Sequence, residues 1–332
     1  MERKKIDPDN FCYYPFMQLL LQPTGVVSPC CWNQEITLGK VPESDLSEIW
    51  NGPRIRELRR EFLEGNPKMC ESQIRNIRCH LWSGRDYSHR LSLDEVQKGG
   101  PKRLDVRLNG KCNLQCVMCD VWKQPNGLYE QSDFWNKGPT EIFPSLLELD
   151  VLGGEPFVQS DTFRLIDEVS AVNPGCTWAF VTNGNYKFSD PIVRRLDKIK
   201  IRWMQVSLDS LREETYRKIR LGGDLQKAIR TLDGILAYQK EREKIGRGFR
   251  VLITMCVQKL NWAEVGEFVG YAKKCGIELV LQFAFQPDTV SLLSLSNDEL
   301  VPVEKYFSSL SGEFGEQILH AVLQPVRDRL GA

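Results

Sequence analysis

The sequence predicts an α/β protein built as an incomplete (β/α)6 barrel, with a small cysteine-rich α+β region before the barrel and helices after it. From residue 104 onward, short apolar stretches typical of buried strands alternate with stretches whose apolar residues recur at helical spacing. This alternation implies parallel strands joined by right-handed helical crossovers. Six strand–helix units fit an incomplete barrel better than an open sheet. We therefore expect three segments, at 1–98, 99–290 and 291–332.

The first segment has short elements. Two stretches, 18–21 and 25–27, flank a Pro-Thr-Gly turn, which predicts a hairpin. Asp45 and Glu48 have the spacing of a capping box, so a helix is expected to begin there and run to residue 50. Pro53 fits the first turn of a second helix.

The second segment supplies the barrel. Helical crossovers are indicated by apolar faces such as the one formed by residues 225, 229, 232 and 236. Ser210 and Glu213 predict a capping box that opens the helix after the fourth strand. The third segment is expected to form helices that cap the barrel. Strands are predicted at 104–108, 146–152, 177–182, 201–208, 250–257 and 277–283.

Composition excludes several classes of protein. The 332 residues carry equal numbers of acidic and basic side chains, which argues against a nucleic-acid partner held by a general basic field. No apolar run is long enough to span a membrane, and the charged N-terminus lacks the apolar stretch of a secretory signal. Eleven cysteines in such a chain indicate a reducing compartment and metal ligation rather than disulfides. A cytoplasmic protein is expected.

The most informative feature is the run of Cys112, Cys116 and Cys119, spaced CxxxCxxC after the first predicted barrel strand. Three thiolates on one loop can bind three irons of a cubane cluster and leave the fourth iron open for chemistry. A zinc site would need a fourth ligand, and the loop offers only Asp120. Disulfides are disfavoured because the number of cysteines is odd.

Small polar residues follow the next three strands. Gly153, Gly154 and Glu155 end the second strand, Asn183 ends the third, and Ser207 and Asp209 end the fourth. Taken singly, each motif is also explained by a tight turn or a helix cap. In parallel α/β folds, however, active sites lie at the carboxyl ends of the strands, which is where the cysteine loop is expected as well. We therefore predict one functional rim.

The run Cys112-Asn-Leu-Gln-Cys116-Val-Met-Cys119, together with these strand-end motifs, resembles the radical S-adenosylmethionine (SAM) enzymes over residues 100 to 290. The resemblance implies a TIM-like partial barrel and a [4Fe-4S] cluster bound by the three cysteines. Its open iron would chelate the amino and carboxylate groups of SAM. One electron would then cleave SAM to methionine and a 5′-deoxyadenosyl radical that takes hydrogen from a substrate. An electron donor such as a flavodoxin or ferredoxin is implied.

Under this resemblance, the strand-end residues are predicted to contact SAM. Backbone carbonyls at Gly153 and Gly154, or the Glu155 carboxylate, would bind the ammonium group. Ser207 and Asp209 offer short oxygen groups to the ribose. Asn183 is predicted to contact SAM at the rim, and Arg220 is predicted at the methionine carboxylate, with an exposed helix-end arginine as the alternative. Met118, Met255 and Val257 are predicted at the adenine, although a core position is the default interpretation for Met255 and Val257.

The N-terminal segment resembles the SPASM and twitch domains, which bind auxiliary iron–sulfur clusters. The motif Cys12-Tyr-Tyr-Pro15, followed by Cys30 and by helices at 46–50 and 54–60, carries this resemblance. It implies one auxiliary cluster ligated by Cys12, Cys30, Cys70 and Cys79, with His80 as a fallback ligand. Many relatives carry the domain after the barrel, and the expected closing CxxC is missing. A structural zinc site made from the same thiolates is the alternative.

Other cysteines and several glutamines have no assigned role. Cys31 is adjacent to Cys30, so a packed thiol is expected. Cys176, Cys256 and Cys275 are interpreted as small buried apolar groups, although Cys256 would be available for thiol chemistry if it faces the barrel interior. Glutamines 205, 258, 282 and 286 lie on or after predicted strands and are candidates to line the cavity.

The expected function is hydrogen abstraction from a substrate, with a peptide or protein as the first hypothesis, because auxiliary-cluster domains are frequent in enzymes that modify them. The absence of a recognisable leader-peptide-binding module weakens this hypothesis. A small metabolite, such as a sugar or nucleotide derivative, is the alternative within the same chemistry. An iron–sulfur electron carrier without radical chemistry is the alternative of another class. A carrier has no need of the nucleoside-binding residues at the rim, which disfavours it.

Overall fold

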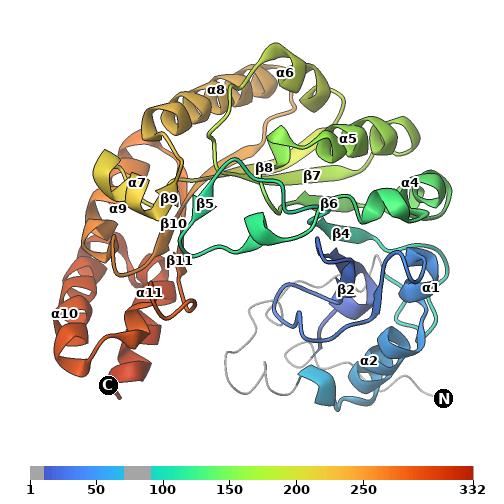
Figure 1. Cartoon of the computed structure of the whole chain (residues 1–332), viewed down its shortest axis with the longest axis horizontal. Coiled ribbons are helices and arrows are strands. Elements are labelled where there is room, and N and C mark those ends of the chain that lie inside the picture. The colour runs from blue at the N-terminus through green and yellow to red at the C-terminus, as the bar shows by residue number, and fades with distance from the viewer. Residues whose placement is uncertain (1–10, 71–90, 332) are drawn as a thin grey trace.

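A computed structural model describes residues 11–70 and 91–331 (Figure 1). Its main sheet has nine strands in the order β11-β10-β8-β7-β6-β4-β1-β2-β3, and β5 and β9 form a separate two-stranded sheet. The strands are β1 Gln18–Leu21, β2 Val26–Ser28, β3 Gly39–Lys40, β4 Arg103–Val106, β5 Gln115–Cys116, β6 Glu148–Val151, β7 Thr177–Thr182, β8 Lys200–Ser207, β9 Arg220–Leu221, β10 Arg250–Val257 and β11 Glu278–Phe283. The α-helices are α1 Leu46–Trp50, α2 Pro53–Glu64, α4 Phe134–Lys137, α5 Ser160–Val172, α6 Asp190–Leu196, α7 Glu213–Ile219, α8 Leu225–Lys244, α9 Val265–Cys275, α10 Asn297–Phe314 and α11 Glu316–Leu330.

Six strands pair in parallel and curve into an arch that does not close: β4, β6, β7, β8, β10 and β11. Figure 1 shows helices α5, α6 and α8 on the convex side of this arch. The prediction of an incomplete (β/α)6 barrel is therefore confirmed. The predicted strands at 177–182 and 250–257 agree with β7 and β10, and the other four agree within two residues at each end.

Alternation along the strands assigns the two faces of the arch. Leu104 and Val106 in β4, and Leu149 and Val151 in β6, are almost fully buried in the hydrophobic core. The residues between them point to the opposite, concave face, because successive side chains of a strand alternate. The concave face is therefore where a ligand would lie, and the helices cover the convex face.

The N-terminal segment continues the barrel sheet. Strand β1 pairs in parallel with β4, in the register Gln18↔Arg103 and Leu20↔Asp105, and the predicted hairpin β1–β2 follows on its far side. The boundary expected at residue 98 thus lies between segments that share one sheet. The physical reason is the exposed edge of β4, whose backbone groups β1 satisfies.

Helices α1 and α2 follow the N-terminal strands and confirm the predicted capping box and first-turn proline. Asp45 and Glu48 form the capping box of α1, and Pro53 opens α2. Arg59 of α2 is fully buried and donates to the carbonyls of Pro15, Trp50 and Glu95, while its guanidinium lies 4.3 Å from the centre of the Trp50 ring. Burial lowers the pKa of Arg59 to about 9. One side chain thus connects α2 to three segments.

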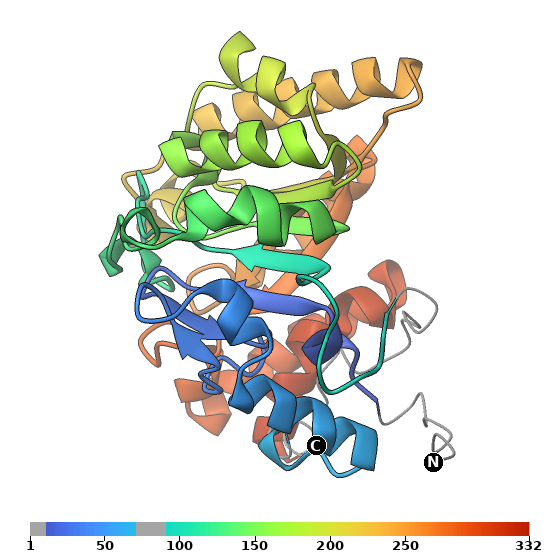
Figure 2. The ribbon, with the colours of Figure 1, turned by 90° about the vertical axis from the view of Figure 1, so that its right-hand side faces the viewer.

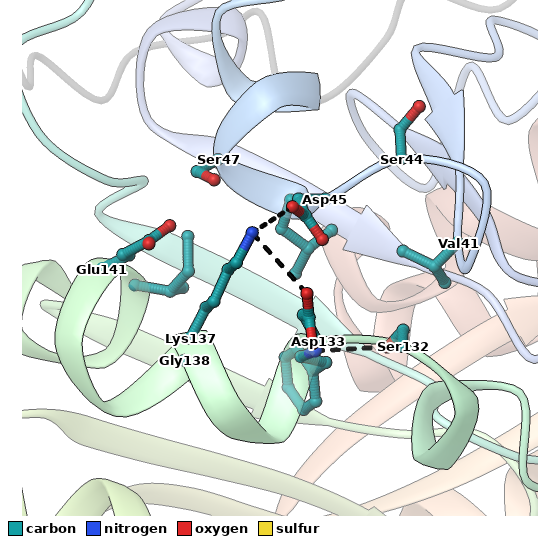
Figure 3. A pocket seen from close by; sticks show the side chains of 12 residues that line it. Val41, Ser44, Asp45, Ser47, Ser132, Asp133, Lys137, Gly138 and Glu141 are labelled. Carbon is teal, nitrogen blue, oxygen red and sulfur yellow. Dashed lines mark hydrogen bonds and ion pairs between the residues drawn. The ribbon is translucent and has the colours of Figure 1, made fainter.

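A small recess separates α1 from α4 (Figure 3). Lys137 of α4 forms an ion pair with Asp45 at the start of α1 and lies 3.6 Å from Asp133. None of the predicted rim residues lines this recess. The recess therefore belongs to the contact between the N-terminal segment and the barrel.

The C-terminal helices complete the other end of the arch. Helix α11 packs on β11, and α10 packs on α11, so that the two chain-terminal units lie at opposite ends of the sheet (Figure 1). In the side view of Figure 2, α1 and α2 lie in front of these C-terminal helices. Leu319, Val322 and Val326 of α11 are buried in the core. Across the described parts of the chain, none of the helices combines the length and apolarity needed to cross a bilayer.

The predicted capping box at Ser210 is wrong. Helix α7 begins at Glu213 with Arg212 at its N-cap, and the Ser210 hydroxyl instead donates to Glu264 Oε2 and accepts from the Arg212 backbone N–H. Ser210 is fully buried, so its hydroxyl bonds to the buried carboxylate of a neighbouring segment.

Candidate functional site

The cysteine loop follows β4 and lies at the carboxyl end of the arch. Cys112 Sγ accepts the Leu114 backbone N–H at 3.4 Å, and the Cys119 backbone N–H donates to the Cys116 carbonyl at 3.1 Å. Cys116 lies on β5, which pairs antiparallel with β9 in the register Cys116↔Arg220. The loop is therefore held by local turns and by a two-stranded ribbon.

Glu155 connects the second strand end to the third. Its side chain is fully buried; Oε1 accepts from the Phe157 backbone N–H and the Thr182 hydroxyl, and Oε2 accepts the Asn183 backbone N–H. Burial raises the pKa of Glu155 to about 7. In this arrangement the carboxylate holds β6 and β7 together, and its two oxygens are already hydrogen-bonded to protein groups.

Gly154 lies against the cysteine loop. Its φ is +55°, and a Cβ placed on it would lie 2.1 Å from the Lys111 carbonyl oxygen. The same carbonyl accepts Gln159 Nε2 at 2.8 Å and the Glu155 backbone N–H at 3.0 Å. Only glycine fits here, because the left-handed backbone and the close approach both exclude a side chain.

Asn183 joins the rim to the cysteine loop directly. Its side-chain amide donates to Asn113 Oδ1 at 2.9 Å and lies 3.7 Å from Cys112 Sγ, and its Oδ1 accepts the Asn185 backbone N–H. Asn113 in turn donates to the Asn185 carbonyl at 2.7 Å. The third strand end and the loop are thus one hydrogen-bonded unit.

Asp209 and Arg220 form a buried ion pair beside Cys116. Arg220 Nη2 lies 2.8 Å from Asp209 Oδ2, and Arg220 Nη1 donates to Cys116 Sγ at 3.8 Å. The Asp209 side chain is only 1% exposed and that of Arg220 only 7%. Burial raises the pKa of Asp209 although Arg220 opposes the change, and burial raises the pKa of Cys116 to about 11.

The arrangement matches a known family. The model of the radical SAM superfamily matches residues 106–272, which is half of the chain. The chain belongs to the radical SAM superfamily. The model of the SPASM iron-sulfur cluster-binding domain matches residues 12–79. Both resemblances seen in the sequence are therefore confirmed, and with them the expected cofactors of these two domains, a [4Fe-4S] cluster with SAM and an auxiliary iron–sulfur centre.

The chain matches individual relatives over only part of their length. The chain is 27% identical over 184 residues to a GTP 3′,8-cyclase from Clostridium botulinum, covering 53% of this chain and 54% of the relative. It is 27% identical over 195 residues to mycofactocin maturase MftC from Mycobacterium tuberculosis, covering 56% of this chain and 46% of the relative. The chain therefore spans about half the length of these curated relatives. Among solved structures, Streptococcus suis SuiB matches 91% of this chain and 69% of its own with TM-score 0.45 and 13% identity.

The residues of the radical SAM loop fit a cluster. Soft thiolates are the ligands that iron–sulfur clusters take, and three of them lie on one loop. Two of the three sulfurs already receive N–H donors, which stabilise the negative charge of cluster sulfur. Within residues 11–70 and 91–331, no three ligands converge on a point suitable for a single metal ion.

The SPASM segment brings two of its predicted ligands together. The Asn33 backbone N–H donates to Cys30 Sγ at 3.4 Å, and the Asn33 side chain lies 3.7 Å from Cys70 Sγ. Burial raises the pKa of Cys30 to about 12. Cys12 is partly buried. Cys79 and His80 lie outside the described residues.

Cys31 follows Cys30 directly and is partly exposed. Burial raises the pKa of its thiol, and smaller influences come from Asp105, Arg107 and Arg103 on β4 and directly after it. That Cys31 lies outside the ligand set of Cys30 stays a prediction.

Two predicted adenine contacts are corrected. Met255 and Val257 have no exposed surface and belong to the hydrophobic core, whereas Cys256 between them is partly exposed and is influenced by Cys116 and Cys119. Strand alternation explains this, since Cys256 is the β10 residue that faces the rim. Met118 and Ser207 are partly exposed at the rim and stay predicted SAM contacts.

The concave face has a charged half. Arg103 and Arg202 both pair with Glu148 and Asp150, and Arg107 pairs with Asp105. Three cationic groups therefore meet three anionic ones, which leaves this half without net charge. No local sequence pattern predicts this network, because its partners come from the units of β4, β6 and β8.

The other half carries polar, uncharged side chains toward the carboxyl ends of its strands, whereas Arg250 and Glu278 form an ion pair at the opposite ends. Ser207 pairs in register with Thr254, and Cys256 pairs with Gln282, so these side chains share one face of β8, β10 and β11. Gln205 lies two residues before Ser207 on the same face, and it is partly exposed, as Cys256 is, whereas Gln282 is exposed. Gln258 is fully buried, and Gln286 is exposed beyond β11.

Several functional residues were missed in the sequence. Asn113, Asn185, Gln159 and Asn261 each hydrogen-bond to strand ends or to the cysteine loop. Asn113 follows Cys112 directly, and Asn185 lies in the Asn183-Gly184-Asn185 turn, so their positions were available. Gln159 and Asn261 carry no motif, and only the fold shows their role.

Proposed function

We propose that Cys112, Cys116 and Cys119 ligate the SAM-binding [4Fe-4S] cluster and that this enzyme abstracts hydrogen from a peptide or protein substrate. With the cluster bound, one electron cleaves SAM to methionine and a 5′-deoxyadenosyl radical that takes the hydrogen. The chain's own residues hold SAM at the rim and keep water away from the reacting atoms.

Contacts with SAM are proposed from the strand ends. The carbonyls of the Gly153–Gly154 turn accept the ammonium group, and Glu155 positions that turn through its bond to Asn183. Ser207 offers its hydroxyl to the ribose, and Met118 packs against the adenine. Asp209 and Arg220 are proposed to support these contact residues rather than to touch SAM, because each is buried and paired with the other.

The concave face carries the substrate proposal. A nucleoside triphosphate needs a site with net positive charge. The arginines of the charged half are matched by carboxylates, and the other half presents amide, hydroxyl and thiol groups. Such a surface suits the alternating donors and acceptors of a peptide backbone.

The relatives' names support both classes of substrate. The name mycofactocin maturase points to the maturation of a precursor, which is compatible with a peptide or protein substrate, whereas the name GTP 3′,8-cyclase points to a nucleotide. The balanced charge of the charged half of the concave face supports a peptide or protein substrate for this chain, and a small metabolite is the second candidate.

For the auxiliary cluster we propose Cys12, Cys30, Cys70 and Cys79 as ligands. The support is the contact of one residue, Asn33, with both Cys30 and Cys70. Cys31, adjacent to Cys30, is proposed to stay outside this ligand set.

The test begins with cofactor chemistry. Anaerobic, reduced protein is mixed with SAM, and 5′-deoxyadenosine is measured against a Cys116→Ala control. The expected result is formation of 5′-deoxyadenosine only in the unaltered protein. Equal amounts in both samples would refute the assigned ligands.

The substrate class is tested next. The reduced protein and SAM are incubated with a peptide library in deuterated buffer, and in parallel with nucleoside triphosphates. Peptide-dependent stimulation of 5′-deoxyadenosine formation, with a mass change in the peptide, is expected. Stimulation by nucleotides alone would replace the peptide proposal with the small-metabolite one.

A further inference from the structure

The Asp209–Arg220 pair is coupled to a proposed cluster ligand. Cys116 and Arg220 are register partners of the β5–β9 ribbon, and Arg220 Nη1 donates to Cys116 Sγ at 3.8 Å. Arg220 Nη2 faces Asp209 Oδ2 at 2.8 Å. One guanidinium thus contacts a cluster sulfur and a carboxylate at once.

The carboxylate is held rigidly in place. Asp209 is the one non-glycine residue of the described chain with a positive φ, 64°. Its Oδ1 accepts the Cys256 backbone N–H at 2.7 Å, and its carbonyl accepts Asn261 Nδ2 at 2.8 Å. Backbone strain of this kind persists only where the surroundings over-determine it. The chain keeps a strained, buried anion next to the cysteine loop, which a purely structural cap would not require.

We propose that the Asp209–Arg220 pair is a positioning and electrostatic unit that sets the reduction potential of the radical SAM cluster through Cys116. This inference rests on the proposed ligand role of Cys116. Net charge near the cluster and hydrogen bonds to its sulfur ligands are two of the means by which a protein adjusts its reduction potential. Arg220 supplies both effects, and Asp209 offsets its charge.

The two partners act in opposite directions. Reduction adds one negative charge to the cluster, so a nearby cation stabilises the reduced form and raises the potential. Replacing Asp209 leaves Arg220 without its counter-charge, which favours reduction. Replacing Arg220 removes both the cation and the N–H donor to Cys116 Sγ, which disfavours reduction. Little screening is expected because both groups are buried.

The experiment measures the potential directly. The signal of the radical SAM cluster is first identified by electron paramagnetic resonance as the one that changes when SAM is added. Reconstituted protein without SAM is then titrated with dithionite, and the intensity of this signal is followed. Asp209→Asn is expected to raise, and Arg220→Gln to lower, the ratio of reduced to oxidised cluster about tenfold at a fixed potential. For a one-electron couple this corresponds to about 59 mV.

Controls separate this effect from a loss of structure. Arg242 of α8 and Asp197, which follows α6, form another ion pair with atoms 2.8 Å apart. Asp197 comes just before the amino end of β8, opposite the carboxyl ends that carry the cysteine loop. Arg242→Gln is expected to leave the potential unchanged. If Arg220→Gln does not assemble the cluster, Asp209→Asn decides alone, since its amide oxygen still accepts the Cys256 N–H.

Shifts of opposite sign support the inference. Unchanged potentials, or shifts of equal sign in both variants, overturn it while the cluster signal and iron content still support Cys116 as a ligand. Loss of the SAM-sensitive signal in the Cys116→Ala protein tests that ligand assignment separately. A failed inference and a failed assignment therefore give different results.

Discussion

Asn183 donates its backbone N–H to Glu155 Oε2 at 2.6 Å, which connects the carboxyl end of β7 to that of β6. Through the Asn183 side chain the same connection reaches Asn113 and Cys112 in the cysteine loop. The geometry of the rim therefore depends on a fully buried carboxylate that has no accessible surface of its own.

Glu155 is expected to make stability depend on pH. Its pKa in the folded protein is about 7, above the ordinary 4.5, so the folded state holds the proton more tightly than the unfolded chain. The free energy of unfolding should therefore fall as pH rises from about 4.5 to about 7 through this group. Denaturant unfolding at pH 5, 6, 7 and 8 measures the slope. The Glu155→Gln variant should show a flatter profile, and an identical profile would contradict the assignment.

Gly154→Ala tests the close approach to the cysteine loop. A Cβ there would lie 2.1 Å from the Lys111 carbonyl at a left-handed φ, so the substitution should lower the free energy of unfolding by about 2–5 kcal/mol. Gly246→Ala is the matched control, since Gly246 also has positive φ, +70°, but open space around it. That control should cost about 1–2 kcal/mol. Equal losses of stability for the two variants in thermal denaturation would show that the cysteine loop can shift to accommodate the added Cβ, which would contradict the prediction.

Arg59→Met should weaken the N-terminal segment. Because Arg59 is buried and donates to three carbonyls, its loss leaves these acceptors unsatisfied and should cost about 3 kcal/mol or more. Arg60→Met on the same helix removes an exposed ion pair with Glu95, which water and salt screen, and should cost far less. Circular dichroism during thermal unfolding compares the two variants, which should differ clearly in melting temperature.

Iron content should divide between two sites. Unaltered protein purified without oxygen is expected to contain about eight irons per chain, and Cys116→Ala and Cys30→Ala about four each. Cys275→Ser is the control, because Cys275 is exposed and lies outside both proposed sites. One zinc with about four irons in the unaltered protein would instead indicate a structural zinc site in the SPASM segment.

Local patterns predicted much of the fold. Hydrophobic periodicity located all six barrel strands, and β7 and β10 agree with their predicted bounds. Caps near the N-terminus were also predicted, because Asp45, Glu48 and Pro53 act within one turn of their own helices. The pattern at Ser210 failed since a buried Glu264 from another segment competed for the same hydroxyl.

Partners across the barrel were not predictable in the same way. Arg220 was predicted at the methionine carboxylate, yet it pairs with Asp209 and contacts Cys116. Met255 and Val257 were predicted at the adenine, and strand alternation places Cys256 toward the rim in their stead. The contacts of Arg220 join residues distant in the sequence, and the burial of Met255 and Val257 depends on which face of β10 the core covers.

The sequence alone determined the cysteine loop, the order of strands and helices, and the strand ends that carry polar residues, because spacing and periodicity are properties of short segments. Only the tertiary structure decided that β1 extends the barrel sheet along β4, that the concave face is charge-balanced, and that a buried ion pair reaches Cys116. These features depend on which segments meet in space. Satisfying an open strand edge or a buried charge requires a partner whose distance along the chain no local pattern records.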